Sequence, residues 1–177
     1  MHYTLFETAI GTCGVVWGEH GLRGVHLPDA NRARTRTGVA RRFPGATPAG
    51  PPADVQQAID GMVALLRGDK RDLREIVLDF DGLPVFNRRV YELARTIGPG
   101  ATLTYGDIAL RLGRPGTARA VGQALGQNPW PIVVPCHRVL AADGGMGGFS
   151  APGGVATKRR MLEIEGVEGV RPSPRLF

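Results

Sequence analysis

Three prolines within seven residues are the feature that most constrains what this chain can fold into. Pro129, Pro131 and Pro135 surround the apolar run 132–134 and stand just before a cysteine and a histidine. Proline removes a backbone donor, fixes φ and biases the preceding residue toward extended conformations. The pattern predicts a buried extended segment over 132–134, with Cys136 at a rigid strand end.

Cys136 and His137 are open to two interpretations. A thiol attacks only as a thiolate, which requires a nearby base or a positive field. In an extended chain neighbouring side chains point apart, so His137 would act through a bridging water or a turn. An isolated Cys-His pair more often marks a buried structural cysteine, so the rest of the sequence has to decide between nucleophile and core residue.

The length and composition of the chain bound the class of protein. With 177 residues it can form one ordinary domain or two small ones, and its 42% hydrophobic and 21% charged residues are typical of a globular protein. No apolar run approaches the roughly 20 residues that cross a bilayer, and residues 1–20 lack a basic segment followed by an apolar one. We expect no membrane association and a cytoplasmic location.

Only two cysteines, Cys13 and Cys136, occur in the chain. So few do not form a secreted disulfide framework, and a cytosolic protein would keep both as thiols, although the sequence leaves a single disulfide open. Cys13 lies near His20 and His26, but without the paired spacing of zinc ligands. We expect no metal and no cofactor, with structural zinc as the minor alternative, and we expect Cys13 to pack in an N-terminal sheet.

The net charge of +6 is distributed unevenly along the chain. Residues 1–82 hold ten basic and ten acidic residues, whereas residues 83–177 hold twelve basic and six acidic ones. A positive C-terminal half that also carries Cys136 indicates an anionic partner, nucleic acid first. The alternative is a basic surface that only favours solubility and nonspecific binding.

The N-terminal segment has the pattern of strands followed by a loop. Residues 3–27 alternate in a strand-like way, and the glycines around Gly21 predict a hairpin within them. Residues 29–53 are rich in Arg, Ala, Gly, Thr and Pro, so we expect an exposed, mobile loop there. The five arginines from Arg32 to Arg42 favour a solvated loop over a DNA-binding patch.

From Asp54 onward the apolar residues recur at helical spacing, which predicts an amphipathic helix that ends at Gly68. Its inward positions are Val55, Ile59, Met62, Val63 and Leu66. An alternating segment over 76–80 then predicts one more strand. Together these elements predict a small α+β unit over 1–82.

The second half of the chain is predicted to be mostly helical. After a helix over 86–97, a short helix over 105–112, a glycine-containing turn over 113–116 and a helix over 118–127 follow one another. Thr117 is expected to cap the last of them. This order is the helix-turn-helix arrangement, whose second helix commonly lies against DNA.

The helix over 118–127 has a thin surface. Ala118, Ala120 and Gly122 are small, and Arg119 is the one long charged side chain among them. A helix that reads the major groove would present several Arg, Asn or Gln side chains. A thin helix with one arginine suits close approach to a minor groove, where little sequence is read. A helix packed closely inside the protein is the alternative.

Four short motifs occur here in the order in which one protein family carries them. They are Thr104-Tyr105, Ala-Arg-Ala-Val-Gly at 118–122, Asn128-Pro129 and Pro-Cys-His-Arg-Val at 135–139. Together they resemble the O6-alkylguanine-DNA alkyltransferases, also called methylated-DNA–protein-cysteine methyltransferases. The resemblance is strong from about Phe86 to Gly166 and is weaker, but collinear, before that range.

The resemblance implies an α+β fold in two parts. Residues 1–82 would form a small RNase H-like domain with an antiparallel sheet and a helix. Residues 83–168 would form a mostly helical, winged-helix-like domain that binds DNA and accepts the alkyl group, with residues 169–177 as a tail. The partner would be alkylated double-stranded DNA, bound through its minor groove by a monomer, and cooperative assembly on DNA stays open.

The resemblance also implies a suicide repair reaction. The damaged guanine would rotate out of the stack, at a cost on the order of a few kcal/mol that is smaller for a badly paired base. The thiolate of Cys136 would take the alkyl group in one displacement, and the protein would not be regenerated. His137 would act as the base through water, and Glu165 would orient and charge His137, as in a triad.

Further site residues follow from the same match. Arg119 would fill the gap in the base stack, and Tyr105 would crowd the phosphate and contact the flipped base. Asn128 would bridge the recognition helix to the cysteine, or simply end that helix. Lys158 would stabilise the site electrostatically, with a solvated helix start as its alternative, and Glu165 has a surface position as its alternative. The predicted DNA-binding residues are Tyr105, Thr117, Ala118, Arg119, Ala120 and Gly122.

The glycine-rich loop 144–154 would form a close wall around the flat base. Ser150 would donate to the guanine oxygen, and Val139 would help to hold the amino edge of the base beside Tyr105. Phe149 stands where many family members have tyrosine, and Trp130 is bulky for its place between two prolines. Both are assigned to the base pocket as departures that affect rate or substrate preference. The range of accepted alkyl groups and the repair of O4-alkylthymine stay open.

Three other classes of protein compete with the repair enzyme. A noncatalytic lesion sensor of the same fold would bind and flip the base, but such relatives replace the cysteine, whereas Cys136 is present here. A winged-helix regulator with a redox-sensing cysteine would leave Asn128, Ser150 and Glu165 without a shared purpose. A cysteine hydrolase would place its Cys and His far apart in sequence.

Overall fold

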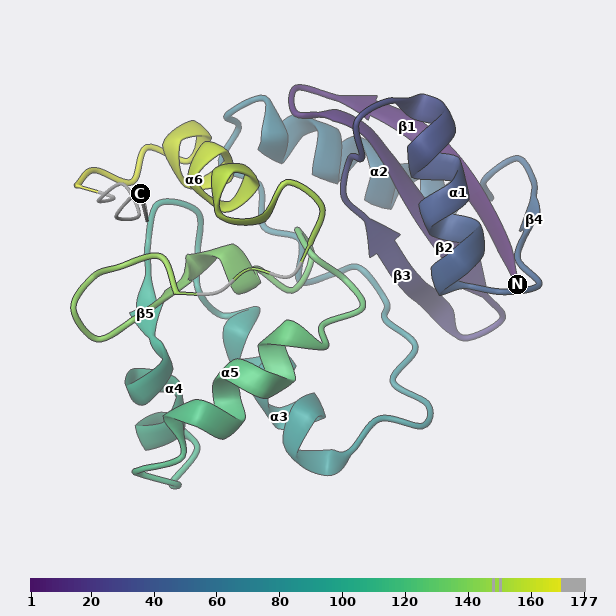
Figure 1. Ribbon diagram of the computed structural model, residues 1–177. Helices are drawn as coiled ribbons and strands as arrows, with labels where there is room; N and C mark the ends of the chain where they lie inside the picture. The colour runs from purple at the N-terminus through teal and green to yellow at the C-terminus, as the bar shows by residue number, and fades with distance from the viewer. Residues whose placement is uncertain (148, 150, 170–177) are drawn as a thin grey trace.

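Figure 1 shows the computed structural model of the chain, in which residues 1–147, 149 and 151–169 are described. A small sheet with two helices lies on one side, and the remaining helices gather on the other. This mixture of sheet and helices confirms the predicted α+β class. The RNase H-like and winged-helix-like descriptions, and the domain boundary at residue 82, stay predictions.

The sheet has the strand order β3-β2-β1-β4. Its antiparallel strands are β1 (His2–Thr8), β2 (Gly11–Gly18) and β3 (Gly21–His26). Gly21 has a φ of 124°, which the turn between β2 and β3 requires and which glycine adopts without steric cost. The predicted hairpin is therefore confirmed.

Helices α1 and α2 cover opposite faces of the sheet, as Figure 1 shows. Their bounds are Arg32–Arg42 for α1 and Ala53–Leu66 for α2. Because alternate strand residues face opposite sides, Cys13 and Trp17 join the core shared with α2, whereas Val16 packs with Val39 of α1. A Cβ on Gly14 would lie 2.6 Å from a Val39 methyl, so glycine there lets α1 approach the sheet closely.

The region 29–53 is not the loop that the sequence predicts, so that expectation is wrong. The Asn31 side chain accepts a hydrogen bond of 2.9 Å from a first-turn N–H and begins α1, and Thr35 and Val39 bury one face of the helix. Strand β4 (Thr47–Pro48) then pairs parallel to β1, so the sheet is mixed rather than purely antiparallel. Two buried residues one helical turn apart are enough to hold an otherwise arginine-rich helix.

The strand expected over 76–80 is also absent from the described structure, where this segment makes only an isolated bridge to Leu22. Leu22 donates to Val77 O and accepts from Asp79 N, both at 2.9 Å. Further along β3, Val25 donates to Pro129 O at 2.8 Å. Two separate segments thus share the outer edge of β3, which leaves room for one bridge instead of a ladder.

The second part of the chain contains four α-helices and a two-stranded parallel sheet among its described residues. The helices are α3 (Val85–Ala94), α4 (Tyr105–Arg111), α5 (Ala118–Gly126) and α6 (Gly154–Ile164), and the sheet pairs β5 (Leu103–Thr104) with β6 (Val139–Leu140). Helices α4 and α5 form the predicted helix pair, and α5 buries Val121, Ala124 and Leu125.

The two helices of this pair begin in different ways. Thr104 caps α4 through a reciprocal hydrogen-bonded box with Asp107. Thr117 occupies the N-cap position of α5, but its hydroxyl donates 2.6 Å to Arg114 O and makes no capping bond. The predicted capping role of Thr117 is therefore wrong, because the preceding turn uses its hydroxyl.

One hydrophobic core runs through both parts of the chain, from Phe6 in β1 to Met161 in α6. Trp130 lies at the junction, 1% exposed, with its ring edge-on to Phe80 and Tyr91 and its Nε1 donating 2.8 Å to Leu22 O. None of the helices among the described residues is both long and apolar enough to span a membrane.

Candidate functional site

A sharp turn, rather than a strand end, presents Cys136. Ile132 has a φ of 78°, Val134 N donates 2.8 Å to Trp130 O, and Cys136 N donates 2.7 Å to Val134 O. The chain then continues as the 3-10 helix η1 (Cys136–Arg138). The extended conformation predicted for 132–134 is therefore wrong, and the alternative of a turn at the Cys-His pair is the one observed.

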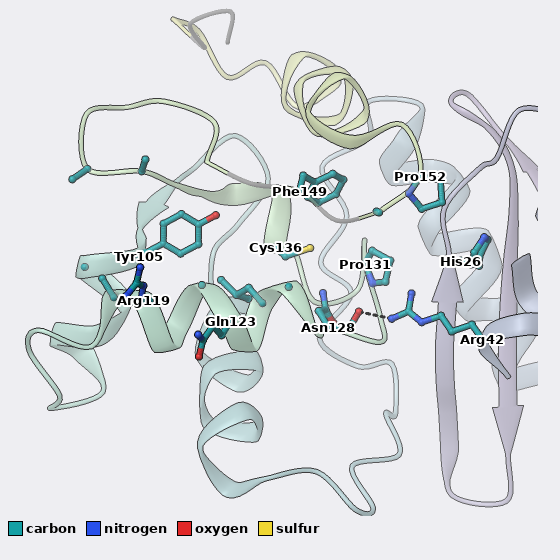
Figure 2. Close-up of a pocket in the computed structure, with 18 residues that line it drawn as sticks. His26, Arg42, Tyr105, Arg119, Gln123, Asn128, Pro131, Cys136, Phe149 and Pro152 are labelled. Carbon is teal, nitrogen blue, oxygen red and sulfur yellow. Dashed lines mark hydrogen bonds between the residues drawn. The ribbon is translucent and has the colours of Figure 1, made fainter. Parts of the chain in front are cut away.

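Cys136 lies at the wall of a cavity of about 1100 Å³. Figure 2 shows Tyr105 and Arg119 at one end of the cavity, Arg42 and His26 at the other, and the Cys136 sulfur between them. This size suits a small ligand or an extruded base. The cavity is lined by His26, Arg42, Tyr105, Gly106, Ala118, Arg119, Gly122, Gln123, Leu125, Gly126, Asn128, Pro131, Cys136, Ala141, Ala142, Phe149, Ala151 and Pro152.

Asn128 connects the end of α5 to the cysteine turn, as predicted, and it is 5% exposed. Its Nδ2 donates 3.0 Å to Val134 O, and its Oδ1 accepts 2.9 Å from Trp130 N. The same side chain hydrogen-bonds Cys136, and this contact lowers the pKa of the thiol against the effect of burial. Asn128 therefore fixes the turn and favours the thiolate.

Lys158 is fully buried in α6, so the alternative of a solvated helix start is wrong. Its Nζ donates 2.7 Å to Val139 O and 2.6 Å to Met146 O, and it lies 5.8 Å from the ring centroid of Tyr105 and 5.9 Å from that of Phe149. Burial lowers the pKa of Lys158 to about 8, although the charge of a Cys136 thiolate opposes this shift. A protonated Lys158 in turn stabilises that thiolate.

Glu165 is 7% exposed at the end of α6, so the surface alternative is wrong for it as well. Its Oε1 lies 2.8 Å from His137 Nε2, and Arg138 donates to both carboxylate oxygens at 2.7 and 2.9 Å. Burial raises the pKa of Glu165, but the hydrogen bonds from His137 and Arg138 outweigh it and bring this pKa to about 2. Glu165 is therefore an anion at neutral pH.

His137 is held as a neutral base. Burial lowers its pKa, and the contact with Glu165 only partly opposes this effect. With Glu165 accepting from Nε2–H, the opposite nitrogen Nδ1 carries the lone pair, and it has no hydrogen-bond partner among the described residues. An orphaned acceptor beside Cys136 can take a proton, directly or through a water.

Cys136 rests as a thiol in this environment. Burial raises its pKa, and Asn128, Lys158 and the backbone N–H groups of Cys136 and His137 only partly offset that effect. Reactivity therefore requires removal of the proton at the moment of attack. The arrangement provides a base for this step and a cation that stabilises the product anion.

The helix pair borders the cavity through four of the predicted DNA-binding residues: Tyr105, Ala118, Arg119 and Gly122. Arg119 is exposed and makes no hydrogen bond or ion pair within the described part of the chain. Thr117 and Ala120 are not part of the cavity wall. Burial, and secondarily Cys136, raises the pKa of Tyr105, so its phenol stays protonated.

The base-pocket assignments are met only in part. Phe149 and Tyr105 line the cavity, and Ser150 lies outside the described residues. Trp130 and Val139 do not line it: Trp130 fills the core between the two parts of the chain, and Val139 is fully buried with its carbonyl accepting from Lys158. The position of a residue in a motif does not reveal the direction in which its side chain points.

Two arginines of the site were not predicted. Arg138 stands within the Pro-Cys-His-Arg-Val motif, but its ion pair with Glu165 spans 27 residues and has no local signal. Arg42, from the region predicted as a loop, donates 2.9 Å from Nη2 to Asn128 O. The only indication of Arg42 in the sequence is the high density of arginines between residues 32 and 42.

Fold and site together define a class: helix-turn-helix proteins with a buried thiol, next to a neutral histidine, at the wall of a cavity beside the second helix. Residues 85–167 match the family model described as 6-O-methylguanine DNA methyltransferase, DNA binding domain. A methylated-DNA–protein-cysteine methyltransferase of Methanothermobacter thermautotrophicus is 38% identical over 154 residues, which cover 87% of this chain and 79% of that protein. The chain therefore belongs to the methylated-DNA–protein-cysteine methyltransferase family.

Further relatives agree along almost the whole chain. The methylated-DNA–protein-cysteine methyltransferase of Mycolicibacterium paratuberculosis is 34% identical over 165 residues, 93% of this chain and 92% of that protein. The crystal structure of Mycobacterium tuberculosis OGT in complex with DNA superimposes with a TM-score of 0.75 at 34% identity, covering 93% of this chain and 92% of that one. The similarity thus includes the N-terminal sheet as well as the helical part.

Proposed function

We propose that this protein repairs alkylated DNA by direct reversal, transferring the alkyl group of O6-alkylguanine to its own Cys136. The observation that carries the proposal is the position of Cys136: it borders a cavity of about 1100 Å³, large enough for an extruded base, and the unpaired Nδ1 of His137 and the buried Lys158 belong to the same site. Membership of a family named for this reaction supports the same conclusion.

In the proposed complex the helix pair binds double-stranded DNA through the minor groove. The thin face of α5 permits close approach, and Arg119 is the long side chain available to enter the stack beside a flipped base. Tyr105, at the same end of the cavity, would contact the extruded nucleotide. The protein would act as a monomer, and binding would weaken with salt because phosphate contacts supply much of the affinity.

The proposed chemistry is one displacement at carbon. His137 Nδ1, through a water, accepts the proton of Cys136, while Glu165 holds the opposite side of the imidazole and stabilises its charged form. The thiolate attacks the alkyl carbon, an S–C bond forms and the C–O6 bond breaks. The electron pair of that bond stays with the purine, which takes up a proton and leaves as guanine.

The thioether that results has no step in this site that would reverse it, so each chain would act once. Because the acceptor must be a free thiol, the reaction requires a reducing environment, and both cysteines are free here.

Intact-mass analysis of the protein incubated with duplex DNA containing O6-methylguanine tests the proposal. We expect the mass of one methyl group per chain, located on the peptide that contains Cys136. DNA binding without any adduct would contradict the enzyme and favour a lesion sensor.

A further inference from the structure

The cavity extends past Cys136 to an end built by the N-terminal part of the chain. Figure 2 shows the Cys136 sulfur directed toward this end, where Pro131 and Pro152 form apolar walls and Arg42 and His26 stand behind them. The proposed base-binding end, with Tyr105 and Arg119, lies on the opposite side of the sulfur. A substituent on the carbon under attack has this end of the cavity beside it, because the attack brings that carbon into contact with the sulfur, which borders both ends.

A positive charge is fixed at this end. Arg42 is anchored by the single hydrogen bond from Nη2 to Asn128 O, and its other N–H groups have no hydrogen-bond partner among the described residues. Arg42 and Cys136 line the same cavity, and the charge of Cys136 raises the pKa of Arg42 against the larger effect of burial. A guanidinium with free N–H groups is suited to bind a carboxylate through two parallel hydrogen bonds.

The polar wall of the same end is incompletely paired. His26 is 93% buried, and its Nε2 contacts the Asp29 carboxylate at 2.8 Å, whereas its Nδ1 has no partner in the described part of the molecule. Asp29 is thus occupied by His26, while Arg34 and Arg41 of α1 line the adjoining groove. Buried polar atoms in proteins are rarely left unpaired, so an orphan at a cavity wall indicates a ligand group or a water.

We infer that this end of the cavity is a subsite for O6-alkyl groups that carry a carboxylate, such as a carboxymethyl group, with Arg42 as the specificity-determining residue. The inference rests on the proposed function. The two prolines contact the methylene, and Arg42 binds the carboxylate. Without that cation a carboxylate close to the Cys136 thiolate would be repelled, because like charges at short range oppose each other.

Transfer of a carboxymethyl group follows the same displacement as transfer of a methyl group. The Cys136 thiolate forms a bond to the methylene carbon, and the bond from this carbon to guanine O6 breaks. Its electron pair and one proton go to the purine. The products are S-carboxymethylcysteine and guanine, with no oxidation or reduction.

Single-turnover rates on three matched duplexes test the inference. They contain O6-carboxymethylguanine, its neutral isostere O6-carbamoylmethylguanine, or O6-methylguanine, and the readout is the ratio of the carboxymethyl rate to the carbamoylmethyl rate for each protein. We expect Arg42→Gln to lower this ratio about fivefold and Arg42→Lys, which keeps the charge, to restore most of it. The wild-type ratio should fall as salt is raised, because salt screens the pair.

Arg41→Gln is the matched control, because Arg41 lies next to Arg42 on α1 but lines only the adjoining groove. Its ratio should equal that of the wild type. An unchanged ratio in Arg42→Gln would overturn the inference, as would an equal loss on all three duplexes, which would make Arg42 a contact to the DNA backbone. Failure of the wild type to accept the methyl group would instead overturn the proposed function.

Discussion

The two cysteines of this chain are both buried thiols, but their surroundings differ in almost every other respect. Cys13 is fully buried in β2, and burial raises its pKa to about 12, with a weak contact of 3.8 Å to the Thr8 hydroxyl. Cys136 is 8% exposed, borders a cavity, and has Asn128, His137 and Lys158 around it. Burial alone therefore makes a thiol inert, and reactivity needs an opening, a base and a compensating charge.

Substitution of each cysteine in turn should show the largest difference between the reactive thiol and the inert one. Cys136→Ser should abolish methyl transfer and keep duplex binding, because the hydroxyl is a far weaker nucleophile in the same position. Cys13→Ala should keep one methyl per chain, at a cost of about 1 kcal/mol in stability for the small cavity that it leaves. Mass spectrometry and a binding titration measure both. Methylation of Cys13 would contradict the conclusion that its buried thiol is inert.

Loss of the anion behind His137 should be the next largest effect. Glu165→Gln leaves the buried Arg138 without its counter-charge, and breaking a buried ion pair costs about 3–5 kcal/mol. We expect a markedly lower midpoint in urea unfolding and a strong loss of transfer rate. Glu163→Gln, which changes an exposed residue of the same helix, is the control and should behave like the wild type. Equal stability of the two variants would contradict the assigned role of Glu165.

Acid should destabilise the protein through Glu165, which lies in the site of Cys136. Because the folded pKa of Glu165 is about 2 and its ordinary value is 4.5, the carboxylate stabilises the fold above pH 5. This contribution is lost as the pH falls from about 5 to about 2, with an upper bound of roughly 3 kcal/mol. Urea unfolding across this range should show a steeper decline in the wild type and in Cys13→Ala than in Glu165→Gln.

The cation at Lys158 should have the smallest of these effects. Lys158→Met removes the charge but keeps most of the buried chain, so the pKa of Cys136 should rise and transfer at neutral pH should slow by about tenfold. The rate should recover as the pH is raised, since more thiolate then forms. Arg160→Met on the exposed face of α6 is the control. A slower rate that no increase in pH restores would assign Lys158 to packing alone.

Local patterns in the sequence predicted the elements whose residues are spaced regularly. Alternation gave the hairpin of β2 and β3, and Val55, Ile59 and Met62 defined α2. The same method missed α1, because Thr35 and Val39 are too few to produce a visible period. The same method also wrongly predicted an extended conformation for 132–134. Prolines and apolar residues are compatible with both strands and turns, and here Ile132 adopts a turn conformation.

The site was predictable to the extent that a family motif defines it. The resemblance to the family indicated Cys136, His137, Asn128, Lys158 and Glu165 as candidate site residues, and all five are buried. It could not give the direction of Trp130 or the ion pair of Arg138 with Glu165. Both features depend on which segments far apart in the sequence pack together, and the residues next to Trp130 and Arg138 in the sequence do not indicate this.

The position of Trp130 has a consequence for how the protein unfolds. Its indole donates to Leu22 O, and one residue earlier Pro129 O accepts from Val25 N, so the turn that presents Cys136 is joined to β3. We therefore expect the matched segment 85–167 to be less stable alone, because cutting the chain before it would expose the indole and remove both hydrogen bonds. Sheet and acceptor turn should melt together in one cooperative transition, and slowed hydrogen exchange at Val25 should report on the integrity of the turn.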